Sequence, residues 1–310
     1  MSQTLVKAFA PATVGNVGCG YDILGLAVEE PGDIVTVEKI NQPGVKIKEI
    51  LGDQGRLPKA ANQNTAGVAA LEFLKEFDIP EGVGITLEKN MPMGSGLGSS
   101  AASAAATLKA MAELFEQKAS EQQLLNIGLK TESTACGSEH ADNIAPSLFG
   151  GIVLVRSNQD GDVVLINVPS NLYCILVHPH IEIRTEDARK ILPKTIGLGK
   201  AVKQWGNIAG LISGFFKEDY DLIGRSLQDW VIEPVRSKLI PGFQQVKNSA
   251  LENGALGCSI SGSGPTIFAL ADSREIADEI SRAMQSAFLE NDLNSDIWIS
   301  PVNQTGAKII

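Results

Sequence analysis

One stretch constrains this chain more than any other: the glycine-rich segment Pro92-Met93-Gly94-Ser95-Gly96-Leu97-Gly98-Ser99-Ser100-Ala101. Alternating apolar residues over 82–89 predict a strand before it, and the alanine-rich run 99–118 predicts a helix after it. Glycines at alternate positions remove the Cβ atoms that would keep the backbone away from an anion. A helix start adds free N–H groups and a partial positive charge. The segment therefore predicts a phosphate-binding loop.

Two other glycine-rich loops fit less well. The pattern GxxxxGK[ST] occurs nowhere in the chain. A dinucleotide fingerprint read from Gly94 has Ser99 at its third glycine position, and one read from Gly96 ends in Ala101, which a looser form allows. The acidic residues at the right distance lie inside the predicted helix. A phosphate loop of a different type is the better interpretation, and the alternative is a strand-to-helix turn whose glycines serve packing.

Charge limits the partners of the chain. The formal net charge is −10, and lysine and arginine are scattered, with no run longer than a pair. We therefore expect no nucleic-acid partner, and an anionic substrate would need its own local cations. No apolar stretch reaches the ~20 residues of a membrane helix and no signal peptide is apparent, so we expect no membrane partner and a cytoplasmic location. Four widely spaced cysteines are expected to be reduced thiols.

Strands and helices interleave without strict alternation, which predicts an α+β fold rather than a doubly wound sheet. The strands are expected at 5–10, 33–40, 45–49, 82–89, 152–155, 172–178, 266–270 and 297–302. The helices are expected at 64–77, 99–118, 121–134, 185–192, 198–218, 219–228, 241–253 and 274–289. The polar turn 157–161 separates a domain over 1–160 from a second domain over 161–310.

Three further segments carry polar groups suited to chemistry. Segment 132–143 holds Glu132, which could serve a metal, and Asp142, which could accept a hydrogen from a hydroxyl; the alternative is a solvated loop with capping side chains. The glycine-rich segment 11–22 carries Asn16 and Asp22 and could equally be a buried turn. The Gly/Ser turn at 261–265 is weak by itself and more typical of structure. A zinc site is disfavoured, because Cys136 and His140 have no second pair beside them.

Together these segments resemble the GHMP kinases, the family of galactokinase, mevalonate kinase and related enzymes. The resemblance covers nearly the whole chain in the family's order: a substrate loop, the P-x-G-x-G-L-G-S-S-A loop and a C-terminal glycine-rich turn at 257–264. Within the family the chain is most similar to the enzymes that phosphorylate L-homoserine. The strings that carry this likeness lie at 10–27, 140–151, 185–193 and 233–236.

The resemblance implies an N-terminal ribosomal-protein-S5-like domain that binds ATP and a C-terminal ferredoxin-like domain. It implies catalytic roles for Asp142 and Asn143, and Mg²⁺ ligands in Ser100 and Glu132. The implied homoserine-binding residues are Asn16, Asp22, His140, Thr185, Arg189 and Arg236. The implied ATP-binding residues are Asn62, Asn64, Pro92, Met93, Gly94, Ser95, Gly96, Leu97, Gly98, Ser99, Ser100, Ala101 and Ala102. Lys89, just before the loop, is a further phosphate candidate, and the resemblance implies a homodimer.

The expected reaction converts ATP and L-homoserine to ADP and O-phospho-L-homoserine, a step towards threonine. A planar guanidinium pairs bidentately with a carboxylate, which supports Arg189 and Arg236 as ligands of the amino acid. Asp142 could orient the hydroxyl or act as a base, and the sequence leaves both roles open. Two other functions remain: a GHMP kinase with mevalonate or a sugar as substrate, and a binding module without catalysis.

Overall fold

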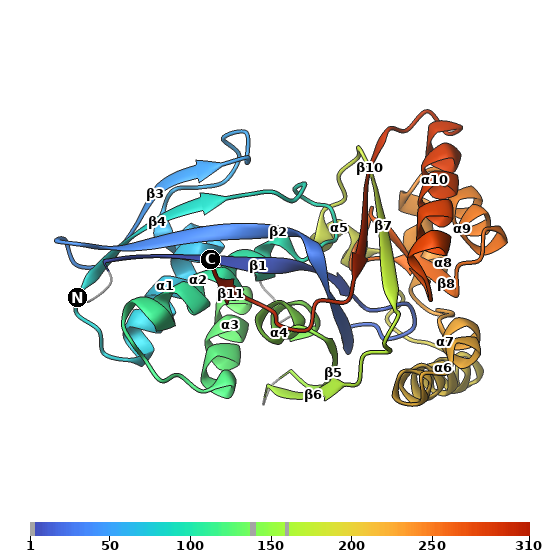
Figure 1. Cartoon of the computed structure of the whole chain (residues 1–310), viewed down its shortest axis with the longest axis horizontal. Coiled ribbons are helices and arrows are strands. Elements are labelled where there is room, and N and C mark those ends of the chain that lie inside the picture. The colour runs from blue at the N-terminus through green and yellow to red at the C-terminus, as the bar shows by residue number, and fades with distance from the viewer. Residues whose placement is uncertain (1–3, 137–140, 159–160) are drawn as a thin grey trace.

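The computed structural model describes residues 4–136, 141–158 and 161–310 (Figure 1). The strands are β1 Leu5–Gly15, β2 Leu24–Ile40, β3 Val45–Leu51, β4 Gly82–Glu88, β5 Ile152–Ser157, β6 Asp162–Ile166, β7 Tyr173–Pro179, β8 Gly257–Ile260, β9 Ile267–Ala271, β10 Ser295–Pro301 and β11 Lys308–Ile309. The α-helices are α1 Thr65–Glu76, α2 Ser99–Leu114, α3 Glu121–Cys136, α4 Ala141–Phe149, α5 Thr185–Lys190, α6 Leu198–Lys217, α7 Tyr220–Ser226, α8 Glu233–Arg236, α9 Phe243–Glu252 and α10 Arg274–Leu289. Short 3₁₀ turns lie at Ala61–Gln63 and Ser237–Leu239.

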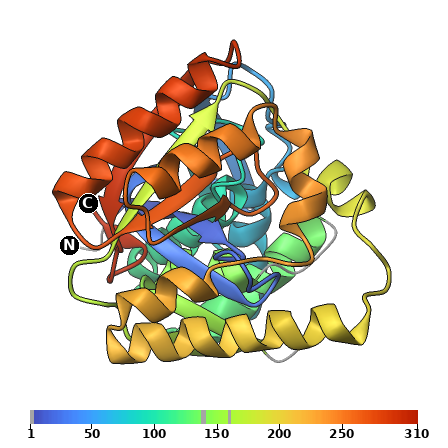
Figure 2. The ribbon, with the colours of Figure 1, turned by 90° about the vertical axis from the view of Figure 1, so that its right-hand side faces the viewer.

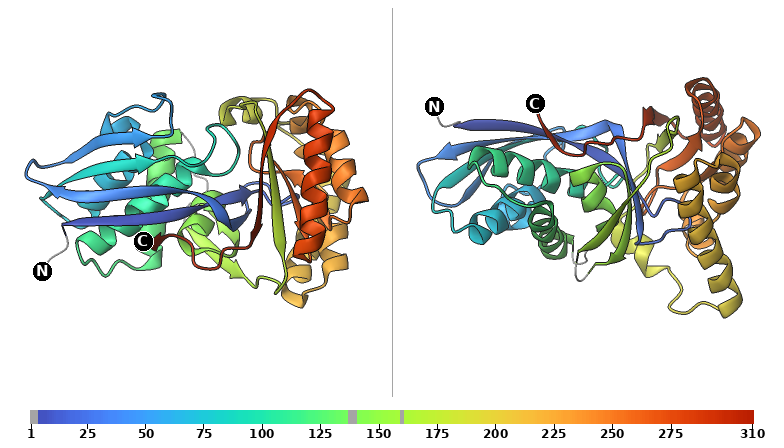
Figure 3. Two further views of the ribbon diagram at one scale, coloured as in Figure 1. Left: turned by 45° about the horizontal axis from the view of Figure 1, so that its top comes forward. Right: turned by 60° about the horizontal axis from the view of Figure 1, so that its bottom comes forward.

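The first sheet has the strand order β11-β1-β2-β4-β3, and β5 and β6 extend it from β2. The long strand β2 makes this possible, because it pairs with β1 in both halves, its second half also pairs with β4, and Leu24–Leu26 pair with β5. Along β1 the residues Val6, Ala8 and Ala10 are buried and alternate with half-exposed neighbours, as expected for a sheet covered on one face. Helices α1, α2 and α4 cover that face, and α3 packs on these three helices (Figure 3).

The second sheet is antiparallel, with the order β10-β7-β9-β8. Its elements follow the β-α-β-β-α-β pattern of ferredoxin-like folds, with α10 between β9 and β10. Alternate residues of β7 face two different cores. Ile175 and Val177 pack against α9 and α10, whereas Cys174 and Leu176 belong to the core shared with the first sheet. Figure 2 shows α9 and α10 on the outer side and α6 running along the base.

The two sheets confirm the α+β expectation. The domain limits stay a prediction. Two strand pairings cross the predicted boundary: β6 lies beyond residue 160 and pairs with β5, and β11 near the C-terminus pairs with β1. The C-terminal segment crosses between the sheets, with Val302 bridged to Val28. The first sheet therefore takes strands from both ends of the chain.

Several expected boundaries were wrong. The helix expected at 99–118 ends at Leu114, where Phe115 caps it and Glu116 takes a left-handed conformation with φ of 51°. Helix α4 was missed, because it is short and contains Pro146, a residue that usually breaks helices. Strand β6 and the short β11 were also missed, since they show no clear alternation.

Three observations concern the expectations on membranes, cysteines and assembly. Within the ranges described above, no helix has the length and apolar character needed to cross a membrane. Cys19, Cys174 and Cys258 are buried free thiols, as expected. Helix α6 carries an exposed apolar stripe at helical spacing, a feature that was not predicted from the sequence. The stripe consists of Leu198, Val202, Trp205 and Phe216, exposed by 72%, 55%, 58% and 62%.

Candidate active site

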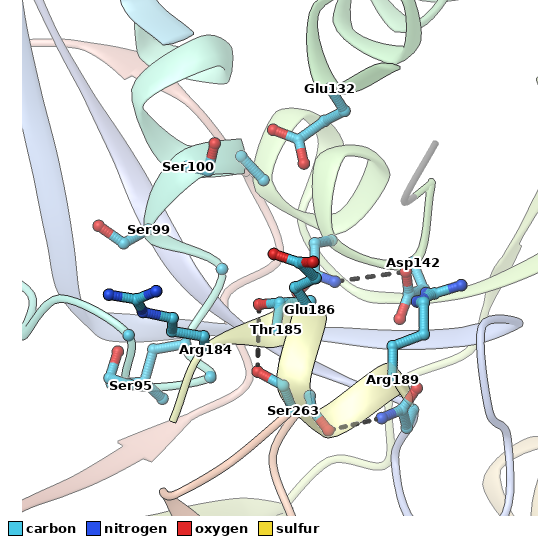
Figure 4. A pocket seen from close by; sticks show the side chains of 18 of the residues that line it. Ser95, Ser99, Ser100, Glu132, Asp142, Arg184, Thr185, Glu186, Arg189 and Ser263 are labelled. Atoms are coloured by element: carbon cyan, nitrogen blue, oxygen red, sulfur yellow. Dashed lines mark hydrogen bonds between the residues drawn. The ribbon is translucent and has the colours of Figure 1, made fainter. Parts of the chain in front are cut away.

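A cavity of about 720 Å³ lies where the predicted phosphate loop, the 16–22 segment and helices α3, α4 and α5 meet (Figure 4). Both halves of the chain contribute to it. Its lining residues are Asn16, Asp22, Gly94, Ser95, Gly96, Leu97, Gly98, Ser99, Ser100, Ala101, Glu132, Asp142, Asn143, Arg184, Thr185, Glu186, Arg189, Lys190, Arg236, Gly262 and Ser263. The structure thus brings together segments that the sequence analysis treated separately.

The structure shows why the loop carries glycine at three positions, whereas phosphate binding at the loop stays a prediction. Gly94, Gly96 and Gly98 all have left-handed backbones, with φ of 63°, 77° and 67°. A Cβ on Gly96 would lie 2.4 Å from the Ser261 carbonyl oxygen, and one on Gly98 would lie 2.1 Å from Thr13 Oγ1. Glycine is therefore required for backbone conformation and for packing, and the same residues line the cavity.

Hydrogen bonds from distant segments hold the loop in place. The Thr13 amide donates to the Leu97 carbonyl at 3.0 Å, and Ser261 Oγ donates to the Gly96 carbonyl at 2.8 Å. The Gly/Ser turn at 261–264, which carried only a weak signal in the sequence, therefore packs directly on the predicted phosphate loop. Ser95 Oγ is buried and has no hydrogen-bond partner among the residues that the structure describes. A phosphate oxygen would satisfy it.

A smaller cavity of about 180 Å³ adjoins the first, and the two share Gly94, Ser99 and Ser100. Met93 and Asn64 line it. Asn64 also caps α1, since its Oδ1 accepts from the amides of residues 66 and 67. The remaining predicted ATP residues lie elsewhere: Asn62 is exposed, Ala102 is buried, and neither they nor Pro92 line these cavities.

Lys89 lines the smaller cavity, but its ammonium is turned under the loop. Its ammonium pairs with Asp33 and donates to the Ser99 carbonyl at 2.9 Å and to Ser103 Oγ at 2.8 Å. These three bonds use the three donors of a lysine. The ion pair is almost fully buried, with side chains 4% and 0% exposed. The contact between Lys89 and phosphate is therefore not supported, and the residue supports the first turn of α2 instead.

Ser100 and Glu132 face the same part of the cavity from the start of α2 and from α3 (Figure 4). Glu132 is only 3% exposed. The described residues contain no cluster of three or more histidine, cysteine or acidic side chains that could hold a metal. Mg²⁺ does not need one, because it takes one or two carboxylates together with phosphate oxygens and water. A hydroxyl and a buried carboxylate beside a phosphate loop fit this ion.

Two arginines form the opposite end of the cavity. Arg236 is 3% exposed and donates to the carbonyls of Ala188 and Gly262 at 3.3 and 2.8 Å. Arg189 pairs with Asp22 at 3.2 Å. The Tyr21 ring lies 5.2 Å from the Arg236 guanidinium carbon and 5.9 Å from that of Arg189. Burial lowers the pKa of Arg236, so an anion placed here would relieve the cost of the buried charge.

Asp142 lies between the loop and the arginines. Its side chain is 2% exposed, and burial, followed by the negative charge of Asp22, raises its pKa to about 7. Asn143 Nδ2 donates to Asp142 Oδ1 at 3.3 Å, and Thr13 Oγ1 donates to Asn143 Oδ1 at 2.8 Å. This chain of bonds orients both side chains. A carboxylate with a pKa near neutrality can accept a proton under ordinary conditions.

Of the other predicted substrate residues, Asn16 and Thr185 line the large cavity. Asn16 Nδ2 donates to the Gly262 carbonyl at 2.8 Å, and its Oδ1 accepts from the Asp22 amide at 3.1 Å. Thr185 Oγ1 lies 3.3 Å from Ser263 Oγ. His140 lies outside the described residues. Tyr21, Arg184 and Ser263 were missed as site residues, because a single tyrosine, arginine or serine carries no pattern in the sequence.

Two family models match this chain: GHMP kinases N terminal domain over residues 64–151 and GHMP kinases C terminal over residues 211–291. A homoserine kinase of Chlorobium phaeobacteroides (strain BS1) is 50% identical over 317 residues, covering 98% of this chain and 99% of the relative. A crystal structure of homoserine kinase from Cytophaga hutchinsonii is 52% identical, with a TM-score of 0.98 and coverage of 100% and 98%. A mevalonate kinase of L. major is 17% identical with a TM-score of 0.72, covering 97% of this chain and 99% of the other, and shares the fold alone.

Proposed function

We propose that the large cavity is where ATP and L-homoserine react, because this chain belongs to the homoserine kinases of the GHMP kinase family. The reaction transfers the γ-phosphoryl group of ATP to the side-chain hydroxyl of L-homoserine and yields O-phospho-L-homoserine for threonine biosynthesis. One observation carries the assignment of the site. A glycine-rich loop at a helix start, a buried carboxylate and two arginines, of which Arg236 is buried, line the same cavity.

The two ends of the cavity suit the two substrates. The backbone of 94–101 would surround the triphosphate at the start of α2, and the smaller cavity beside Asn64 would take the nucleoside. Arg189 and Arg236 would bind the homoserine carboxylate. The Asp22 carboxylate, already paired with Arg189, would attract the ammonium group of the substrate. Asn16 holds this end together through its bond to Gly262.

Asp142 would receive the attacking hydroxyl. The hydroxyl oxygen forms a bond to the γ-phosphorus as the bond to the β-phosphate oxygen breaks, and ADP leaves. The hydroxyl proton passes to the Asp142 carboxylate, whose pKa of about 7 suits uptake and later release to solvent. Phosphoryl transfer depends mainly on alignment and on neutralising charge, so orientation by Asp142 and Asn143 contributes even when the proton moves late.

Ser100 and Glu132 would hold Mg²⁺ beside the triphosphate. When bound, the ion neutralises charge on the β- and γ-phosphate oxygens. Glu132 supplies a carboxylate that is already buried at this place, which limits its alternatives to a cation or a hydrogen-bond donor. Glu132→Gln should therefore raise the Mg²⁺ concentration needed for half-maximal rate. An unchanged Mg²⁺ dependence would contradict this role.

Two wider features complete the proposal. We propose a homodimer, which the apolar stripe of α6 supports, because exposed apolar patches often mark protein interfaces. Phe216→Glu would then shift the mass measured by light scattering towards the monomer.

We also propose a cytoplasmic enzyme, since ATP is its co-substrate and its described cysteines are free.

A coupled ADP-release assay tests the function directly. The panel contains L-homoserine, L-serine, L-threonine, mevalonate and galactose, each with ATP and Mg²⁺. We expect turnover with L-homoserine at a kcat/KM at least about 100-fold above that of the others, since the site matches a carboxylated primary alcohol of one chain length. Faster turnover of mevalonate or galactose would assign the chain another substrate. ATP binding without ADP release in any mixture would indicate a binding module.

A further inference from the structure

The phosphate loop lacks a cation of its own. No lysine or arginine occurs between residues 90 and 102, and the ammonium of Lys89 is bonded to three oxygens under the loop. The chain as a whole carries a net charge of −10. A cationic side chain beside the loop would strengthen the binding of a nucleoside triphosphate beyond what a helix start and a metal ion provide. Such a side chain could come from another part of the chain.

The cationic side chains that line the large cavity differ in what they contact. Arg189 pairs with Asp22, and Lys190 pairs with Glu186 and Asp187. Arg236 is turned towards the homoserine end. Arg184 forms no ion pair and no hydrogen bond through its side chain with any residue that the structure describes. Figure 4 shows its guanidinium beside the loop, near Ser95 and Ser99 and away from Arg189.

The backbone around Arg184 is fastened to the ATP side of the cavity. The Ile183 amide donates to the Gly94 carbonyl at 3.3 Å. Glu182 accepts two bonds from Arg56 at 2.9 and 2.7 Å, which joins this segment to the loop after β3. A Cβ on Gly94 would lie 2.4 Å from Glu182 Cγ, so the two segments are in close contact. Arg184 therefore has an anchored backbone and an uncommitted side chain.

A second group at the same place lacks a partner. Ser95 Oγ is inside the loop, in a residue that is 2% exposed, and no described atom accepts or donates a hydrogen bond to it. An unpaired buried hydroxyl is costly unless a ligand completes it. Ser95 and Arg184 together present a hydroxyl and a planar guanidinium at one side of the loop. That pair matches the oxygens of a phosphate group.

We propose that Arg184, together with Ser95, binds the phosphate chain of the nucleotide where the two cavities meet. The proposal rests on the function proposed above and adds a residue from the C-terminal half of the chain to the ATP site. The two cavities share Gly94, Ser99 and Ser100, so the phosphate chain passes this point between the nucleoside and the γ-phosphate. The contact is therefore made to the β-phosphate, which ADP retains and AMP lacks. The contact of segment 182–184 with Gly94 places the Arg184 guanidinium beside the loop.

Titration calorimetry with AMP, ADP and the non-hydrolysable analogue AMP-PNP tests the proposal. Arg184→Met should weaken ADP and AMP-PNP binding by about 10- to 100-fold, the range of a charged hydrogen-bonded contact, and AMP binding by less than about threefold. Arg184→Lys should lie between, because it keeps the charge without the fork. Ser95→Ala should weaken the same two ligands by about three- to tenfold. Lys194→Met removes an exposed charge outside both cavities and should change none of these affinities.

Two results would overturn the proposal: unchanged ADP affinity in Arg184→Met, or an equal loss for AMP and ADP. If Arg184→Met does not fold, the Arg184→Lys and Ser95→Ala variants decide by the same criterion. Kinetics separate this proposal from the function it rests on. An active wild type whose Arg184 variants keep their KM for ATP would refute only the arginine contact. A wild type that binds ADP but does not phosphorylate homoserine would refute the function.

Discussion

Replacing Asp142 by asparagine measures how much stability the folded protein loses by burying this carboxylate. The carboxyl is 2% exposed, and burial beside the negative Asp22 raises its pKa from 3.8 to about 7. Below pH 3.8 both the folded and the unfolded chain hold the proton. As the pH rises towards 7, the unfolded chain releases the proton first, so the free energy of unfolding falls. Above pH 7 both states are ionised and the loss is complete.

The size of this effect follows from the two pKa values. Each pKa unit corresponds to about 1.4 kcal/mol, so the full loss between pH 3.8 and 7 is at most about 4 kcal/mol. The position of Asp142 in the first turn of α4 favours the charged form and reduces that figure. Asparagine cannot ionise, but it loses one acceptor for the amides of Asn16 and Asn143, which costs about 1 kcal/mol. We expect Asp142→Asn to be slightly less stable than wild type at pH 4 and about 1–3 kcal/mol more stable at pH 8.

Urea unfolding of both proteins at intervals from pH 4 to pH 8 provides the measurement. Asp221→Asn, an exposed carboxylate on α7, is the matched control and should show a constant difference from wild type. In the same samples, Asp142→Asn should lower kcat by about 100-fold or more at pH 8. A stability difference that does not change with pH would refute the argument that this carboxylate is held with a raised pKa. Full activity of the variant would refute its place in the reaction.

Three further predictions follow from the same geometry. In steady-state kinetics, Arg236→Leu should raise KM for homoserine by at least about tenfold and KM for ATP by less than about threefold. Equal increases in the two KM values would contradict the assignment of Arg236 to the homoserine carboxylate. Wild-type kcat/KM for homoserine should rise about tenfold per pH unit below pH 7 and level off above it, because Asp142 must be ionised to accept the proton; a flat profile would exclude that role. Lys89→Met leaves the Asp33 carboxylate buried without its cation and should lower the free energy of unfolding by about 3–5 kcal/mol in urea, whereas a loss below about 1 kcal/mol would show that the pair is dispensable.

Local chemistry explains why parts of this site could be predicted from the sequence. The phosphate loop was predictable because alternate glycines, a preceding strand and an alanine-rich helix are all short-range features. Residues 94–101 line the large cavity. Asp142 and Glu132 were predictable as candidates because segment 132–143 holds acids, an imidazole and an amide within twelve residues. Their burial was not predictable, because it depends on packing of α4 against β1 and β2 and of α3 against α1, α2 and α4, and the raised pKa of Asp142 follows from that burial.

Contacts between distant segments explain what was missed. Lys89 was a phosphate candidate by sequence position, but Asp33, 56 residues away, turns it under the loop. The Gly/Ser turn at 261–264 appeared structural, yet it packs on Gly96 and carries the carbonyl that binds Arg236. Arg184 stands alone in the sequence, and only the contact of segment 182–184 with Gly94 brings it to the loop.

The amino-acid sequence by itself determined the glycine-rich turn between a strand and a helix, the α+β class and the resemblance to GHMP kinases, because each depends on residues close together or on strings with specific spacing. The tertiary structure alone decided which charges share the cavity. Two sheets from the two halves of the chain meet across it, so Asp142 is desolvated, Arg189 and Arg236 converge on Tyr21, and Arg184 reaches the loop. Desolvation and convergence depend on the whole fold, because a side chain loses water only when residues from elsewhere in the chain cover it.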